Sequence, residues 1–237
     1  MQEREIFCDD FHFNGKMTPA LTASVVDGFW AKADTSAGGS PTLTAAGGEM
    51  VATLVSTNEI ENLCLYHGDI LSYNIDNLVR AEYHFRATCT AAGTIVIGMA
   101  SARADDPDAI AAHAHFRLDG ATNALKVETD DGVNDVNDID TGIVLPTART
   151  TKLVIDFASG LQTLGPPSNS LGGKGAVQFF VEDSRGQLRR VCKTTAFNMS
   201  NYSAGLQPYM QVQKTASVDT PVAQLRRVRI YHRLPAA

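Results

Sequence analysis

The sequence has little charge, few aromatic residues and no long apolar run. Charged side chains make up 19% of the 237 residues, below the usual quarter or so, and there is a single tryptophan. The longest apolar run, at residues 94–100, is far shorter than the roughly 20 residues that span a bilayer. The charged N-terminus leads into no signal-peptide stretch. We therefore expect a soluble protein that is made in the cytoplasm and has no membrane partner.

A dense basic surface and paired cysteines are also missing. The formal net charge is −6, whereas binding to a nucleic-acid backbone needs clustered lysine and arginine, so we expect no direct nucleic-acid partner. The four cysteines lie at positions 8, 64, 89 and 192, with no Cys-x-x-Cys pair. We expect reduced thiols that are mostly packed in the interior.

Helical periodicity is almost absent, and short alternating stretches separated by Gly, Pro, Asn and Asp take its place. This pattern predicts an all-β fold, a two-sheet antiparallel sandwich, in a single domain over residues 1–237. About a dozen strands are predicted, at residues 5–13, 25–31, 49–56, 60–66, 78–88, 94–101, 111–118, 124–129, 151–157, 175–182, 187–194, 206–214 and 223–233.

The connections between these strands are less regular. We expect a short N-terminal arm over residues 1–5, a long surface loop over residues 161–173 and a Gly/Ala/Thr-rich connection over residues 36–48. The best candidate for a helical turn is residues 105–112, where Pro107 must stand at its start. Asp183 and Gly186 favour a type I turn that closes a hairpin, and we expect the first and last strands to pair.

The sequence lacks the local motifs of several well-known catalytic and phosphate-binding sites. There is no Gly-x-Ser-x-Gly elbow, no cysteine in an activating context and no Walker pattern around Lys174. We therefore assign no catalytic residue and no cofactor, and expect a protein that is not an enzyme.

Two histidines have a spacing that metal sites use. His113 and His115 lie on one face of a predicted strand, whose apolar face carries Ala114 and Phe116. Because the sequence offers no third ligand in view, we expect these histidines on a solvated or interface surface.

The stretch from Glu128 to Asp140 is unusually acidic. Asp130, Asp131 and Asp135 are the candidate calcium ligands, but the order of an EF-hand is missing. Asp130, Asp131 and Gly132 also suit the turn of a charged hairpin tip. We favour the hairpin tip and assign no metal.

Basic residues collect towards the C-terminal end, in contrast to the acidic middle of the chain. Guanidinium groups bind carboxylates in a bidentate manner and are enriched in interfaces. The interface candidates are Arg189, Arg190, Arg226, Arg227, Arg229 and Arg233.

Three groups of short sequence segments resemble those of a known family. They are Cys8-Asp9-Asp10-Phe11 with Trp30 and Gly47-Gly48-Glu49; residues 127–132 with Asp140-Thr141-Gly142; and residues 206–215 with the closing strand at residues 227–230. Together they resemble the concanavalin A-like (laminin G-like) jelly-roll proteins among the virion structural proteins of tailed bacteriophages.

The resemblance implies a two-sheet jelly roll and a capsid decoration or cement protein on the virion surface. The implied partners are the major capsid protein and other copies of this chain, in a homo-oligomer that is often a trimer. The same superfamily contains lectins, so a carbohydrate-binding module of a phage tail or fibre is the alternative. It also contains glycoside hydrolases with a Glu-x-Asp-x-x-Glu strand. Here Glu128 and Asp130 match, but Val133 stands at the position of the second glutamate.

Overall fold

The computed structural model describes residues 3–11, 30–69, 72–157 and 174–233. Within these residues, the chain forms sixteen strands, against the dozen or so expected, in two antiparallel sheets. Two single-turn 3₁₀ helices accompany them, η1 (Pro107–Ala109) and η3 (Lys174–Ala176). No helix of the described residues is long and apolar enough to cross a membrane.

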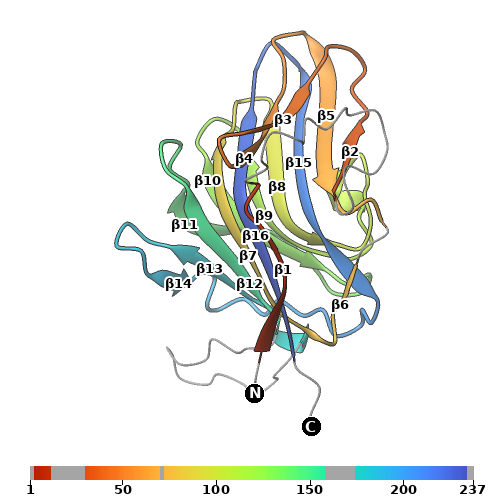
Figure 1. Ribbon diagram of the computed structural model, residues 1–237, viewed down its shortest axis with the longest axis vertical. Coiled ribbons are helices and arrows are strands. Elements are labelled where there is room, and N and C mark those ends of the chain that lie inside the picture. The colour runs from red at the N-terminus through yellow and green to blue at the C-terminus, as the bar shows by residue number, and fades with distance from the viewer. Residues whose placement is uncertain (1–2, 12–29, 70–71, 158–173, 234–237) are drawn as a thin grey trace.

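The first sheet has the strand order β14-β13-β12-β7-β16-β4-β3, and β1 pairs with β16 (Figure 1). β1 and β4 share one edge of β16, because β4 pairs with its first residues and β1 with its last. The strands of this sheet are β1 (Glu3–Asp9), β3 (Thr42–Ala46), β4 (Glu49–Thr53), β7 (Leu78–Thr88), β12 (Thr151–Asp156), β13 (Gln178–Glu182), β14 (Leu188–Arg190) and β16 (Val222–Arg233).

The second sheet has the order β11-β10-β9-β8-β15-β5-β2, and β6 pairs with β15. Strands β8 to β11 are consecutive in the chain, whereas β15 lies between β8 and β5, which are both far from it in sequence. The strands of this sheet are β2 (Ala31–Asp34), β5 (Glu59–Tyr66), β6 (Tyr73–Asn74), β8 (Gly93–Ala100), β9 (His113–Asp119), β10 (Ala124–Asp130), β11 (Asp135–Val144) and β15 (Gly205–Ser217).

The core fills the space between the two sheets, because alternate side chains of each strand point to opposite faces. On β9 the core residues are Ala114, Phe116 and Leu118. On β7 of the other sheet, Tyr83 and Phe85 join the same core. The outer face of the second sheet is the face turned away from this core, and it carries His113 and His115 of β9.

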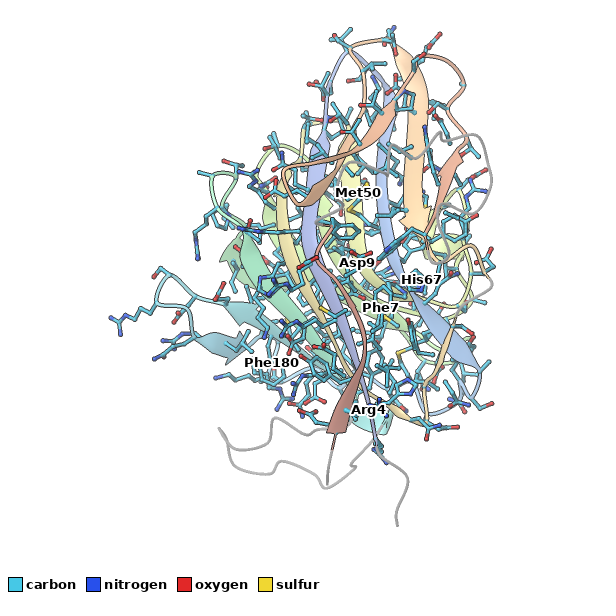
Figure 2. All side chains as sticks on the ribbon, viewed as in Figure 1. Arg4, Phe7, Asp9, Met50, His67 and Phe180 are labelled. Atoms are coloured by element: carbon cyan, nitrogen blue, oxygen red, sulfur yellow. The ribbon has the colours of Figure 1, made fainter. Side chains whose placement is uncertain are left out.

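The predicted pairing of the terminal strands is confirmed, and Asp9 and Trp30 meet at the end of β1. β1 runs antiparallel to β16, from Glu3 opposite Arg233 to Asp9 opposite Val228. At the end of β1, the Trp30 indole donates a hydrogen bond to Asp9, with a separation of 2.7 Å. Phe7 lies beside His67 in the same aromatic group (Figure 2), with ring centroids 5.0 Å apart.

Two local predictions are confirmed. β13 and β14 form the expected hairpin, in which Gly186 has a φ of 77° and donates its N–H to the Asp183 carbonyl. The predicted helical turn is the single turn η1, which begins at Pro107. The four cysteines are free thiols, but only Cys64 and Cys89 are buried, so the expectation that most of them are packed in the interior holds for two of the four.

Three strands were missed, and the shortest of them is the two-residue β6. The predicted connection at residues 36–48 contains β3, which forms a tight hairpin with β4 around Gly47 and Gly48. Both glycines have positive φ, which a two-residue hairpin turn requires. β11 was missed because it is a polar edge strand whose pairing with β10 is interrupted by two register shifts, which obscures its alternation.

Two further predictions concern residues that the structure does not describe, and a third concerns the N-terminal arm. The loop at residues 161–173 and most of the strand at residues 25–31 lie outside the described residues. Of the expected arm, residues 3–5 are described, and they belong to β1.

Candidate functional site

The site begins with the alternation of β9. His113, His115 and Arg117 point to the outer face of the second sheet, because the residues between them point into the core. The neighbouring strand β10 brings an acid to the same face, since Glu128 lies directly opposite His115. A third candidate ligand thus comes from the next strand, at a register that the sequence did not reveal.

Burial of the two histidines corrects a prediction. We expected a solvated or interface surface, yet the exposed fractions of His113, His115 and Glu128 are 1%, 0% and 0%. Residues 101–112, here called the covering loop, lie over this face and contain η1. Ile110 of this loop packs with Cys64, Val96, Ala100 and Tyr209 in a second apolar cluster, separate from the main core.

Hydrogen bonds fasten the covering loop to the sheet. The side-chain amide of Gln211 donates to the Asp105 carbonyl at 2.8 Å and to the Asn62 side chain at 2.7 Å. Asn62 donates to the same Asp105 carbonyl at 2.9 Å. The Tyr209 hydroxyl lies 2.6 Å from the Gln211 side-chain oxygen. Buried polar groups of β5 and β15 therefore hold a loop that joins β8 to β9.

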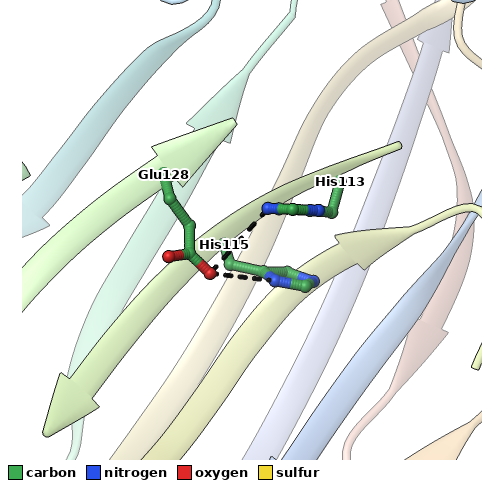
Figure 3. Close-up of side chains that lie close together, drawn as sticks. All are labelled: His113, His115 and Glu128. Carbon is green, nitrogen blue, oxygen red and sulfur yellow. Dashed lines mark ion pairs between the residues drawn. The ribbon is translucent and has the colours of Figure 1, made fainter. Parts of the chain in front are cut away.

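The three side chains of the cluster approach one another closely (Figure 3). Glu128 Oε1 lies 3.5 Å from His115 Nδ1 and 3.9 Å from His113 Nε2. The two imidazole rings are stacked, with centroids 4.6 Å apart and planes 16° apart. His113 Nδ1 lies 3.1 Å from the Ile110 carbonyl, which can only accept a hydrogen bond. The proton of neutral His113 is therefore on Nδ1, and the lone pair of Nε2 is turned towards Glu128.

Gly98 leaves room for a second pair of stacked rings in the site, those of His115 and Tyr209. Gly98 on β8 lies between Tyr209 on β15 and His115 on β9 in the lateral register. The rings of His115 and Tyr209 stack across it, with centroids 5.5 Å apart and planes 18° apart. A side chain at position 98 would collide with the β9 backbone, because a Cβ there would lie 2.1 Å from the Ala114 carbonyl oxygen.

Burial controls the protonation of the cluster. It raises the pKa of Glu128 to about 7, against the opposing charge of Arg117. Burial lowers the pKa of His113 to about 4, helped by His115, and the pKa of His115 to about 3, helped by Arg117. Near neutral pH both imidazoles are uncharged, and Glu128 is close to the midpoint of its titration. Such a carboxyl group can give or take a proton, which is the property of a general acid or base.

Arg117 is the charged neighbour of this cluster. Its guanidinium lies 3.4 Å from Glu128 Oε2, and it also pairs with Asp108, Asp119 and Asp138. The charge of this arginine is therefore neutralised by carboxylates from η1, β9, β10 and β11.

The candidate calcium ligands lie at the β10–β11 turn, as the hairpin interpretation predicts. Asp131 accepts hydrogen bonds from Asn134 and Asn201, and Asp130 accepts one from Gly132. Asp135 accepts one from the side chain of Asn137. Val133, at the position of the missing glutamate, is in the turn and not on β10.

The six candidate interface arginines do not form one patch. Arg189 and Arg190 are on β14 at an edge of the first sheet, and Arg189 pairs with Asp183. The other four belong to β16, from which β14 is separated by β7, β12 and β13. Two of these four pair with acids near the N-terminus, Arg227 with Asp10 and Arg229 with Glu5.

Comparison with known proteins supports the fold. No protein-family model matches the sequence, and no curated protein is similar to it in sequence. Among solved structures, the Bacillus licheniformis beta-glucanase is 13% identical with a TM-score of 0.56, over 94% of this chain and 96% of that chain.

Two further structures extend this likeness. One comes from a description of endo-acting O-glycanases that members of the human gut microbiota express. It is 9% identical to this chain with a TM-score of 0.61, over 98% of this chain and 100% of that chain. The other is the carbohydrate recognition domain of Emp47p, at 9% identity and a TM-score of 0.51, over 90% of this chain and 93% of that chain. None of these three connects the chain with a bacteriophage particle.

The comparisons correct our expectation that the protein is not an enzyme. The similar structures include an endo-1,3-beta-glucanase of Thermotoga petrophila besides the two glycosidases above, so the same framework carries catalysis in those proteins. The absence of these local motifs was too narrow a ground for excluding catalysis. At these identities the likeness establishes the architecture, and the protein is an all-β, two-sheet jelly-roll sandwich of the concanavalin A-like type.

Proposed function

We propose that this chain binds carbohydrate as a lectin-like protein. The observation that carries the proposal is the likeness, over at least 90% of the chain, to structures described as a carbohydrate recognition domain and as glycan-cleaving enzymes. Their descriptions differ in activity but share the class of ligand. A sugar-binding role therefore needs fewer assumptions than any other role for this fold.

The open surface of the first sheet is the better place for a ligand. The outer face of the second sheet is closed by the covering loop, which buries Tyr209 and Gln211. The first sheet, in contrast, has a hollow of about 300 Å³ on its outer side. The residues that line it are His84, Thr150, Arg226 and Arg227.

The chemistry of this hollow favours an acidic sugar. Arg226 is exposed at a bulge of β16, and within the described residues it makes no ion pair. Burial, helped by the charges of Lys152 and Arg227, lowers the pKa of His84, so its imidazole is neutral near pH 7 and can accept a hydroxyl hydrogen bond. Guanidinium groups bind carboxylate or sulfate groups through two hydrogen bonds. We therefore expect uronic or sulfated glycans to bind better than neutral ones.

A glycan array with matched acidic and neutral polysaccharides tests the proposal. We expect the protein to retain acidic glycans, and Arg226→Glu to weaken binding by roughly tenfold or more, the effect of losing one charge-assisted contact. Arg189→Glu is the matched control, because Arg189 is an exposed arginine at the far edge of the same sheet. Release of reducing sugar from the retained glycans would show that the protein also cleaves the glycans that it binds. A protein that retains no glycan would refute the proposal.

The role in a virion stays a prediction. If the major capsid protein or another copy of this chain were the partner, the arginines of β16 would still be suitable contacts. Arg226→Glu would then abolish attachment to capsid shells or self-association without any glycan being bound.

A further inference from the structure

We propose that His113, His115 and Glu128 form a binding site for a transition-metal ion of the Zn²⁺ type, buried beneath the covering loop. One nitrogen or oxygen atom from each of these residues lies within 4.8 Å of the others. Two imidazoles and a carboxylate are a ligand set that zinc accepts, with one position left for water. This inference concerns the outer face of the second sheet and does not depend on the proposed glycan site.

Unsatisfied atoms are the strongest argument for an ion. His113 Nε2, both ring nitrogens of His115 and Glu128 Oε1 are buried, and none has a hydrogen-bond partner among the described residues. A buried polar atom without a partner costs roughly 1–3 kcal/mol, so four of them together in a protein interior require an explanation. A bound cation would give three of these atoms a partner at once.

The neighbours of the cluster have the properties of an outer shell. The Ile110 carbonyl accepts from His113 Nδ1, which directs the Nε2 lone pair inwards, as is usual for metal-binding histidines. Arg117 holds the other carboxylate oxygen of Glu128 at 3.4 Å, which leaves Oε1 for the ion.

The local charge also permits a cation. Arg117 and Lys126 face four carboxylates, which belong to Asp108, Asp119, Asp138 and Glu128. The acids therefore outnumber the bases around the cluster. A divalent ion would reduce this excess of negative charge.

Binding requires the side chains to move closer together. Ligand atoms of a tetrahedral zinc site with bonds of about 2.0–2.1 Å are about 3.3 Å apart, whereas Glu128 Oε1 is 3.5 and 3.9 Å from the two ring nitrogens. The rings are nearly parallel, so one imidazole must turn about its Cβ–Cγ bond to bring both nitrogens onto one ion. The covering loop closes the entry path, so we expect faster loading during refolding than in the folded protein.

In the test, a chelator first removes metal from the protein. Zn²⁺ or Co²⁺ is then either added to the folded chain or supplied during refolding, and the amount of bound metal per chain is measured. We expect one ion per chain, a visible absorption band for Co²⁺ and a rise in Tm of about 5–10 °C at a hundredfold excess of free Zn²⁺ over Kd. Glu128→Gln and His113→Gln should each lower the affinity at least tenfold. Asp130→Asn is the matched control, because it removes a carboxylate from the same strand outside the cluster.

Circular dichroism in the presence of chelator identifies a variant that fails to fold, and the other variant then decides. Wild-type protein that holds no metal after either treatment would overturn the proposal. Metal retained equally by both cluster variants, or lost equally in Asp130→Asn, would also overturn it, because the ion would then be bound elsewhere.

Discussion

The rings of His115 and Tyr209 stack across Gly98, with their centroids 5.5 Å apart. Two aromatic side chains on non-adjacent strands can meet in this way because the strand between them has no side chain at the shared position. On the other side of His115, Glu128 completes the same lateral row of the sheet. This row of side chains on β15, β9 and β10 is the floor of the buried cluster.

Replacing Gly98 by alanine tests how tightly this row is packed. The new Cβ would lie 2.1 Å from the Ala114 carbonyl oxygen and 2.9 Å from His115 Cα, so β8 and β9 would have to move apart. We expect a loss of about 1–3 kcal/mol in the free energy of unfolding, measured by urea denaturation. Gly175→Ala is the control, since its Cβ would meet no atom closer than 3.7 Å. Equal stability of the two variants would contradict the packing described here.

Replacing Lys214 by methionine tests a buried ion pair. Lys214 Nζ donates to the carbonyls of Val55, Thr57 and Ser217 at 2.5, 2.7 and 2.8 Å, and it lies 3.7 Å from Glu61 Oε1. Both charged side chains are fully buried, so the variant leaves Glu61 without its counter-charge. We expect the free energy of unfolding to fall by about 3–5 kcal/mol in guanidinium titrations. Adding Glu61→Gln should restore part of this loss, and no recovery would show that the charge of Glu61 is not the cause.

The pH dependence of stability tests Asp131. Burial acts to raise the pKa of this carboxyl group, but hydrogen bonds from Asn134 and Asn201 outweigh it and hold the pKa at about 2. Because the folded-state pKa is below the ordinary value, the carboxylate stabilises the fold above about pH 4 and loses this effect as the pH falls towards 2. Asp131→Asn should therefore cost about 2 kcal/mol at pH 6 and much less at pH 2, by chemical denaturation at each pH. A cost that does not change with pH would contradict this assignment.

Hydrogen exchange tests the attachment of the covering loop. Gln211→Ala removes the amide that bonds both Asn62 and the Asp105 carbonyl. We expect the amides of residues 101–112 to exchange faster by roughly tenfold, because the hydrogen bond to Asp105 is lost together with the one that positions Asn62. Gln224→Ala on β16 of the other sheet is the control and should leave these amides unchanged. Unchanged exchange in Gln211→Ala would mean that the remaining contacts, the Asn62 hydrogen bond to Asp105 and the packing of Ile110, are sufficient to hold the loop.

Prediction of the fold succeeded where local pattern and turn chemistry act together. The alternation in residues 113–118 and the Asp183–Gly186 turn identify their strands without any knowledge of partners. The Gly47-Gly48 turn was a usable signal for the β3–β4 hairpin, and it was missed because the flanking Ala and Thr residues show weak alternation. Neither the order of strands in a sheet nor the covering of an outer face is visible in such patterns.

The sequence by itself determined the class of fold, the position of most strands and the face of β9 on which His113 and His115 lie. These properties depend on side-chain period and turn residues, which are local. Tertiary structure alone decided that Glu128 would stand opposite His115, that Gly98 would admit the ring of Tyr209 and that residues 101–112 would bury the histidines. The pKa values of the cluster follow from that burial, because removing water penalises charge whichever residues carry it. The same two histidines would be ordinary surface residues if the covering loop were absent.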